Sequence, residues 1–252
     1  MRKTYRNKNV REYWGVRWRN VPADLPMENE SVYPLCYSNQ MINRTNGRIL
    51  EAGCGAGRVL RYYHDRGYDI EGIDFIKEVI DKLERVDPSL KVMVGDITKL
   101  SYRNDTFDFV LAFGLYHNLD ENLQLAIDET HRILKPEGGL CVSFRADNLQ
   151  TKISDWIERI KANRKPFSGR SRNREFHKMN LTKREFRELF NQSGFKVGSI
   201  ATVQNMPFLY KFRWFRYGSG IHGNSFLQNG PDGLWIWTDV LWHLYVPIPA
   251  RA

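Results

Sequence analysis

Residues 49–57 read ILEAGCGAG, and this short stretch decides the fold that we expect for the chain. An apolar pair and the acid Glu51 lead into Gly53, Gly55 and Gly57, and an amphipathic stretch with helical spacing follows. Glycine suits a backbone with positive φ, or one lying flush against a ligand, because a Cβ atom would collide there. The stretch therefore predicts a buried strand, a tight turn and a helix, with a ligand bound where the strand ends.

The spacing of the glycines separates two kinds of cofactor site. A dinucleotide site is typically G-x-G-x-x-G, but this chain has Arg58 at the third glycine position. The pattern present, E-x-G-x-G-x-G, resembles the first motif of class I S-adenosylmethionine-dependent methyltransferases. Any tight strand-to-helix turn would also fit this stretch, so the remaining motifs must decide.

Composition limits the class of protein. The 252 residues are enough for one large domain, or for one domain with a cap, and the net charge of +9 favours an anionic partner. Nucleic acid, phosphorylated metabolites and anionic lipid surfaces all fit that charge. Three cysteines without a C-x-x-C pair indicate neither a metal site nor disulfides, and we expect a cytoplasmic protein. We see no signal peptide and no transmembrane segment.

Strand and helix patterns alternate through the middle of the chain. Alternation of this kind is typical of a parallel sheet with helices on both faces. The expected strands are 48–52, 69–74, 91–95, 107–113 and 139–145, and the expected helices are 57–66, 76–86 and 120–134. Later in the chain, Thr182 and Glu185 are spaced as a capping box, which predicts a helix start ahead of a sixth strand at 195–203.

The domain organisation follows from these patterns. We interpret 1–47 as an N-terminal lid or arm and 48–252 as the main domain. The domain carries a basic insertion at 147–180, in which 155–160 is expected to be helix and 161–178 loop. Its last part, 204–252, is rich in aromatic residues, and 234–246 fits either a seventh strand or a helix.

Acids follow the second and third expected strands. Asp74 suits the two hydroxyls of a ribose, but a nicotinamide dinucleotide or a helix N-cap would explain it equally well. Asp96 ends the third strand, where a carboxylate can accept hydrogen bonds from an amino group, although an ordinary loop acid would fit this position as well.

Two later stretches complete the set of motifs. Residues 107–119 read FDFVLAFGLYHNL and residues 131–139 read HRILKPEGG. With the glycine turn and the two acids, they resemble class I S-adenosylmethionine-dependent methyltransferases, especially the small-molecule branch. The resemblance covers 48–146. It implies a Rossmann-like, doubly wound α/β fold with a seven-stranded sheet, mostly parallel with an antiparallel C-terminal strand, plus an N-terminal lid and a cap insertion after strand five.

The resemblance also implies a cofactor and the residues that hold it. The cofactor would be S-adenosyl-L-methionine, with S-adenosyl-L-homocysteine as the product. Asp96 would bind the adenine amino group. The full cofactor set expected is Glu51, Gly53, Cys54, Gly55, Gly57, Asp74, Phe75, Asp96, Ile97, Ala112 and Phe113.

The acceptor side has fewer candidates. His117 has an ordinary pKa near 6.5, which suits a general base at neutral pH, but a structural histidine fits the motif as well. Tyr13 and Trp14 in the arm, with Tyr116, are expected to form a lid or contact the substrate.

We therefore expect methyl transfer to an oxygen or nitrogen atom of a small metabolite, phosphorylated or sugar-bearing. An RNA methyltransferase and a non-catalytic binding or scaffold protein are the alternatives. The N-P-P-Y signature of many base methyltransferases is absent, which disfavours RNA. The basic residues of 161–178 fit a solvated loop, a phosphate clamp or an RNA contact. The aromatic residues of 204–252 fit core, a pocket wall or a peripheral membrane contact.

Overall fold

The computed structural model describes residues 1–6, 14–15, 23, 25–42, 47–163, 175–203 and 239–245. Its strands are β1 (Arg2–Arg6), β2 (Ile49–Ala52), β3 (Ile70–Asp74), β4 (Lys91–Val94), β5 (Phe107–Ala112), β6 (Leu134–Arg145), β7 (Glu175–Asn180), β8 (Lys196–Val203) and β9 (Asp239–Tyr245). Its helices are α2 (Leu35–Met41), α3 (Arg58–His64), α4 (Lys77–Val86), the 3₁₀ turn η1 (Tyr116–Asn118), α5 (Leu123–Ile133), α6 (Leu149–Asn163) and α7 (Lys183–Gln192).

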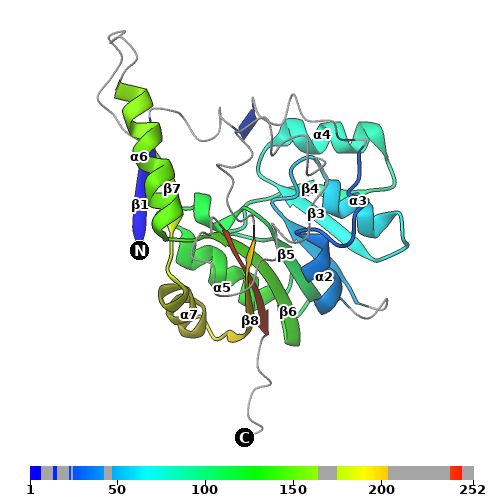
Figure 1. Ribbon diagram of the computed structural model, residues 1–252. Helices are drawn as coiled ribbons and strands as arrows, with labels where there is room; N and C mark the ends of the chain where they lie inside the picture. The colour runs from blue at the N-terminus through cyan, green and yellow to red at the C-terminus, as the bar shows by residue number, and fades with distance from the viewer. Residues whose placement is uncertain are drawn as a thin grey trace, which may run out of the picture.

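The central sheet has the strand order β4-β3-β2-β5-β6-β9-β8 (Figure 1). The first five strands in this order are parallel, and β9 runs antiparallel to both β6 and β8. The mostly parallel, doubly wound fold predicted from the sequence is thus confirmed. The order of the strands reverses between β2 and β5, and such a reversal opens a crevice at the carboxyl ends of the strands.

Helices cover both faces of this sheet. Strand side chains alternate between the faces, so Leu50 and Val110 pack with α5 and α7, whereas Ile49 and Leu111 pack with α2, α3 and α4. All four of these side chains are fully buried. Both faces are covered, so the central strands are largely apolar. The short apolar runs at 49–52 and 107–112 therefore predicted buried strands correctly.

The insertion after β6 differs from the sequence-based expectation. The expected helix at 155–160 belongs to the longer α6, and the expected loop at 161–178 is wrong at both ends, because α6 reaches Asn163 and 175–180 forms strand β7. The part between them, 164–174, lies outside the described residues. Strand β7 pairs antiparallel with β1, so the chain's first residues supply the hydrogen bonds that a lone segment would lack.

The later elements agree with the sequence. Thr182 and Glu185 form the predicted capping box, in which each side chain bonds to the other residue's backbone N–H. Strand β8 matches the expected sixth strand, and β9 resolves the choice at 234–246 in favour of a strand. Most of the aromatic segment, 204–238 and 246–252, lies outside the described residues.

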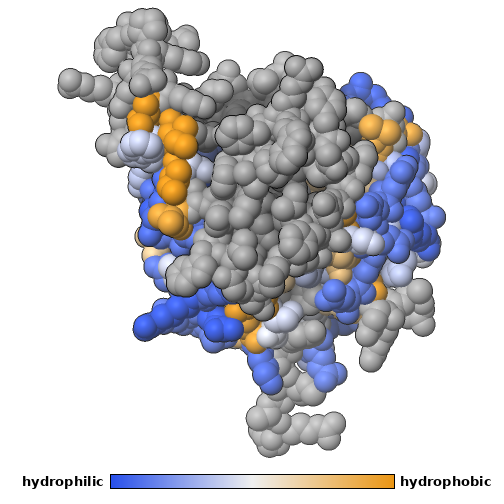
Figure 2. Space-filling model, viewed as in Figure 1, coloured by the Kyte–Doolittle hydropathy of each residue, from blue (hydrophilic) through white to orange (hydrophobic). Residues whose placement is uncertain are grey.

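Helix α6 carries apolar side chains on its outer surface. Leu149, Ile153, Trp156 and Ile157 are spaced along one side of the helix and are exposed, and Figure 2 shows apolar atoms gathered over this part of the molecule. Among the described residues, no helix has the length and apolar character needed to cross a lipid bilayer.

Candidate active site

A cavity of about 600 Å³ opens at the carboxyl ends of the parallel strands. Strands β2 to β5 and the turns after them supply most of its wall, and the segment before β2 and strand β7 supply the rest. The side chains and turns around it are Trp14, Met27, Tyr33, Pro34, Glu51, Gly53, Cys54, Ala56, Arg58, Val59, Ile73, Asp74, Phe75, Gly95, Asp96, Ile97, Thr98, Phe113, Gly114, Leu115, His117, Asn118, Leu119, Asn122 and Lys178.

The glycine turn after β2 has the backbone that the sequence predicted. Gly53, Gly55 and Gly57 have φ values of 71°, 51° and 70°, in the left-handed region that glycine tolerates best. A Cβ atom at Gly57 would lie 2.5 Å from Cδ2 of Leu83 in α4, so the turn is also tightly packed. The turn is held to β3 because the N–H groups of Gly53 and Cys54 both donate to the carbonyl oxygen of Ile73.

Asp74 anchors this turn from the tip of β3. Its two carboxylate oxygens accept hydrogen bonds from the N–H groups of Gly55 and Ile76, each at 3.0 Å. Burial raises its pKa, and these backbone bonds act against that rise. Ile76, not Asp74, is the N-cap of α4, so the N-cap interpretation is wrong, although Asp74 does bond to the cap residue. Each oxygen keeps a further lone pair for a ligand.

Glu51 is buried beside Asp74, and its polar contacts do not fully offset the cost of burying its carboxyl group. Its pKa is raised to about 8: burial is the main cause, the charge of Asp74 adds to the rise, and a backbone hydrogen bond from Leu60 acts against it. Its Oε2 atom is buried and has no hydrogen-bond partner among the described residues. A buried, unpartnered carboxylate oxygen at a cavity wall is costly unless a bound donor or cation compensates it.

Asp96 follows β4 and is more exposed. Its Oδ1 atom accepts hydrogen bonds from the N–H and the hydroxyl of Thr98, at 2.9 Å and 2.7 Å. The apolar side chains of Phe75 and Ile97 line the cavity as well. Glu51, Asp74 and Asp96 form what we call the acidic end of the cavity.

The tip of β5 lies at the middle of the cavity. Phe113 packs edge-to-face on Tyr33, with ring centroids 5.9 Å apart. The Ser143 hydroxyl of β6 connects the arm before β2 with the turn after β5. It accepts hydrogen bonds from the Tyr33 hydroxyl at 2.9 Å and from the Gly114 N–H at 2.8 Å. The arm before β2 is thereby tied to the strand tips.

His117 and Lys178 form what we call the basic end. Strand β7, which carries Lys178, packs beside η1 and β6, on the side of β5 away from β3 and β4. Burial lowers the pKa of His117 well below its usual value, and the charges of Lys178, Arg145 and His177 lower it further. The imidazole is therefore neutral at pH 7, and its buried Nδ1 atom has no hydrogen-bond partner among the described residues.

Several predicted site residues lie elsewhere. Tyr116 does not line the cavity: its ring is fully buried against Phe190, and its hydroxyl bonds to Thr130 Oγ1, because η1 turns it into the core. Gly55, Gly57 and Ala112 are not among the residues that line the cavity. Tyr13 lies outside the described residues, and its neighbour Trp14 lines the cavity.

The sequence analysis missed more than half of the cavity residues, and three of these bear most on the site. Met27 and Tyr33 lie in the arm, where no periodic pattern marks the residues that turn inward. Lys178 was counted only as one charge in a basic run, and its place in the site depends on pairing with β1, which leaves no local signal.

Comparison with known proteins identifies the domain. Residues 50–142 match a family described as a methyltransferase domain. A malonyl-[acyl-carrier protein] O-methyltransferase of Enterobacter lignolyticus is 29% identical over 114 residues, which cover 45% of each chain. A demethylmenaquinone methyltransferase of Renibacterium salmoninarum is 33% identical over 97 residues, covering 38% of this chain and 40% of the relative. The chain thus spans less than half the length of these curated relatives.

Solved structures extend the likeness in fold. A SAM-dependent methyltransferase of Methanosarcina mazei superimposes with a TM-score of 0.60 at 19% identity, over 86% of this chain and 99% of that one. Fold and sequence match together support a class I S-adenosylmethionine-dependent methyltransferase. More particularly, residues 50–142 are its methyltransferase domain, and S-adenosylmethionine is the cofactor that this family implies.

The residues present fit that cofactor. S-adenosylmethionine offers an ammonium, two ribose hydroxyls and an adenine amino group as donors, and the acidic end offers three carboxylates as acceptors. The unpartnered Oε2 of Glu51 is the strongest sign of a missing donor or cation. Phe75 and Ile97 supply apolar surface of the kind against which a planar ring packs.

Proposed function

We propose that the protein transfers a methyl group from S-adenosylmethionine to an oxygen or nitrogen atom of a small metabolite that carries a phosphate or sugar group. The observation that carries this proposal is the acidic end, where three carboxylates on successive strand tips surround one cavity above a glycine turn. The match of residues 50–142 to a methyltransferase domain supports it.

When bound, the cofactor would supply a methyl group on a positively charged sulfur, and the sulfur would keep the electron pair of the C–S bond as the acceptor atom takes the methyl group. Glu51, Asp74 and Asp96 would hold and orient the donor. Correct alignment of two reactants can lower the barrier by about 7–11 kcal/mol, so positioning is the main task of these residues.

The acceptor would lie between Phe113 and the basic end. His117 would contact it as a neutral imidazole, and any proton that the acceptor loses would pass to this ring or to water. We assign the arm before β2 the role of a lid, because Trp14, Met27 and Tyr33 line the cavity from this segment. An apolar cover of this kind excludes water from the reacting atoms.

The first test is calorimetric titration of the full chain with S-adenosylmethionine and S-adenosylhomocysteine. We expect saturable binding of one equivalent of each. Methyl-labelled cofactor is then incubated with a small-molecule extract and, separately, with an RNA pool, and products are identified by mass. Label in the small-molecule fraction supports the proposal. Label only in RNA indicates an RNA methyltransferase, and binding without transfer indicates a non-catalytic protein.

A further inference from the structure

We infer that the methyl acceptor carries an anionic oxygen group, a carboxylate or phosphate, which Lys178 binds at the basic end of the cavity. The inference rests on the proposed function and adds the chemical class of the acceptor and the residue that selects it.

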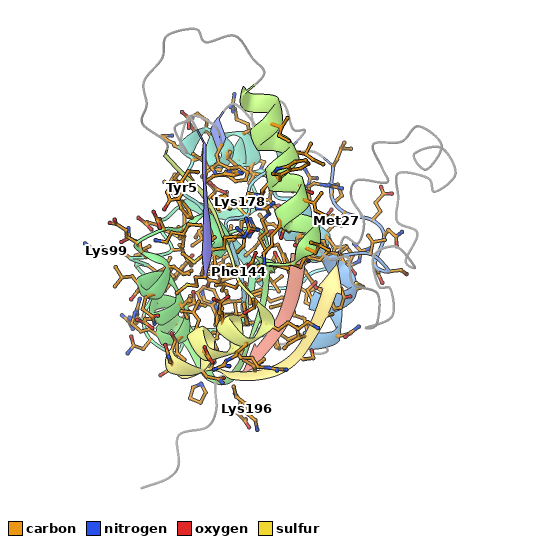
Figure 3. All side chains as sticks on the ribbon, turned by 60° about the vertical axis from the view of Figure 1, so that its left-hand side comes forward. Tyr5, Met27, Lys99, Phe144, Lys178 and Lys196 are labelled. Carbon is orange, nitrogen blue, oxygen red and sulfur yellow. The ribbon has the colours of Figure 1, made fainter. Side chains whose placement is uncertain are left out.

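The position of Lys178 is fixed by backbone pairing between distant parts of the chain. Its Cα atom is in register with Thr4 of β1, and its carbonyl oxygen accepts a hydrogen bond from the Thr4 hydroxyl at 3.1 Å. Figure 3 labels Lys178 beside β1 and above Phe144 of β6, and the residue is half-buried. The side chain lines the same cavity as the acidic end. The two-stranded ribbon formed by β1 and β7 therefore places the cationic side chain of Lys178 at the cavity.

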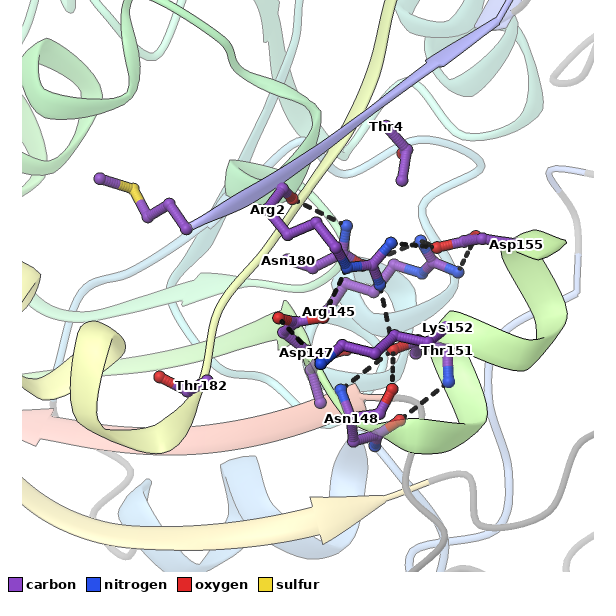
Figure 4. Close-up of polar contacts among 12 residues, drawn as sticks. Arg2, Thr4, Arg145, Asp147, Asn148, Thr151, Lys152, Asp155, Asn180 and Thr182 are labelled. Atoms are coloured by element: carbon purple, nitrogen blue, oxygen red, sulfur yellow. Dashed lines mark hydrogen bonds and ion pairs between the residues drawn. The ribbon is translucent and has the colours of Figure 1, made fainter.

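The ribbon is itself held by a part-buried polar network (Figure 4). Arg2 of β1 donates to Asp147 at 2.5 Å and to Asp155 of α6 at 2.6 Å. Arg145, at the end of β6, donates to Asp155 at 2.9 Å and to Asn180 of β7 at 2.9 Å. Asn180 in turn donates to the carbonyl oxygen of Arg2 at 3.0 Å. The network joins β1, β6, β7 and α6, so it fixes the strand that carries Lys178.

The two ends of the cavity differ in charge. The acidic end suits the donor groups and the positive charge of the cofactor. The basic end has a lysine next to a buried, neutral histidine whose Nδ1 lacks a partner among the described residues. A lysine ammonium and an imidazole N–H together form a binding site for anionic oxygens, and charge-assisted hydrogen bonds are the strong ones.

The test uses the complex of the full chain with S-adenosylhomocysteine, titrated by calorimetry with inorganic phosphate and with malonate as probes. We expect the wild-type complex to bind at least one probe, and Lys178→Met to weaken that binding by about tenfold or more, since hydrogen bonds to charged groups contribute about 1.5–3 kcal/mol. Lys178→Arg should keep the affinity within about threefold because it keeps the charge.

A matched control separates this effect from a loss of overall charge. Lys196 begins β8 and is exposed at the far end of the molecule from Lys178 in Figure 3. Lys196→Met should leave probe binding unchanged. If the wild-type complex binds neither probe, or if Lys178→Met binds as tightly as wild type, the inference is wrong while the proposed function stands. If S-adenosylhomocysteine itself does not bind, the proposed function fails first.

Extract labelling then separates the two anions. Pretreatment of the extract with alkaline phosphatase should abolish methyl transfer if the acceptor is a phosphate ester. A carboxylate acceptor would survive that treatment, and a methyl ester product would release labelled methanol in mild base. An acceptor that mass identification shows to carry neither group would overturn the inference.

Discussion

The acidic and basic ends of the cavity are assembled in different ways. At the acidic end, each functional side chain lies at or just after the carboxyl end of β2, β3 or β4, and nearby backbone groups hold it, as the Gly55 and Ile76 N–H groups hold Asp74. At the basic end, the position of Lys178 depends on pairing with Thr4 of β1, which lies 174 residues earlier in the chain, and on ion pairs that reach α6. The comparison implies that cofactor binding and acceptor binding can be damaged separately.

The largest expected effect breaks the acidic end. Asp74→Ala should weaken S-adenosylmethionine binding by about 100-fold or more, because it removes a charged acceptor and leaves the Gly55 N–H unpaired at the turn. Calorimetry measures the affinity, and denaturant unfolding checks that the variant is folded. Asp69→Ala is the matched control, since Asp69 precedes the other end of the same strand and pairs with Lys91 at the surface. Unchanged affinity in Asp74→Ala would refute the ribose assignment.

The contrast between the two ends also explains what the sequence could reveal. Glycines with positive φ, strand-terminal acids and apolar runs are local features, so the parallel sheet and the acidic end could be predicted from residues 49–119. The position of Lys178 could not, because a lysine in a basic run looks the same whether it faces solvent or pairs into a ribbon. The prediction that Tyr116 contacts the substrate was wrong for a different reason. Its motif is local, but the direction of its side chain depends on packing against Phe190 of α7.

A second prediction concerns the polar network that holds the basic end in place. Arg2→Ala should lower the free energy of unfolding by about 2 kcal/mol, because it removes a part-buried charge with two carboxylate partners. Burial acts to raise the pKa of Asp155, but Arg145 and Arg2 outweigh it and hold that pKa below its usual value. Cofactor affinity should stay within about threefold of wild type. Urea denaturation and calorimetry measure the two quantities.

The control for Arg2 is another arginine in an ion pair. Arg184 pairs with Glu188 on the exposed side of α7, and Arg184→Ala should change the free energy of unfolding by less than about 0.5 kcal/mol. If Arg2→Ala were as mild as this control, or if it weakened cofactor binding as much as Asp74→Ala, the two ends would not be independent.

A third prediction concerns the buried acid of the acidic end. The pKa of Glu51 is raised to about 8 in the folded protein from 4.5, so the folded state binds the extra proton between these values. Stability from this group is therefore present below pH 4.5 and is lost as the pH rises through 8. Glu51→Gln should stabilise the cofactor-free protein at pH 8 by about 1–2 kcal/mol, yet weaken S-adenosylmethionine binding by about tenfold.

Thermal and denaturant unfolding at pH 6 and pH 8 measure this trade-off. Glu71→Gln serves as the control, because Glu71 lies in the adjoining strand β3 and is already paired with Arg48 and Tyr102. The control should be neutral or destabilising at both pH values. A Glu51→Gln variant that is less stable than wild type at pH 8 would mean that Glu51 is compensated in the absence of cofactor.

The smallest effect distinguishes two roles for His117. A general base typically contributes about 10²- to 10⁴-fold to the rate, but it needs a pKa near the working pH. Burial and the charges of Lys178, Arg145 and His177 hold the pKa of His117 well below its usual value, so the ring is a weak base. If the anionic oxygen is itself the atom that receives the methyl group, that atom has no proton to lose. We therefore expect His117→Gln to lower kcat by less than about tenfold, with unchanged cofactor affinity. A loss of 100-fold or more, with a pH–rate profile that loses its acidic limb in the variant, would instead make His117 the base and the acceptor a protonated group.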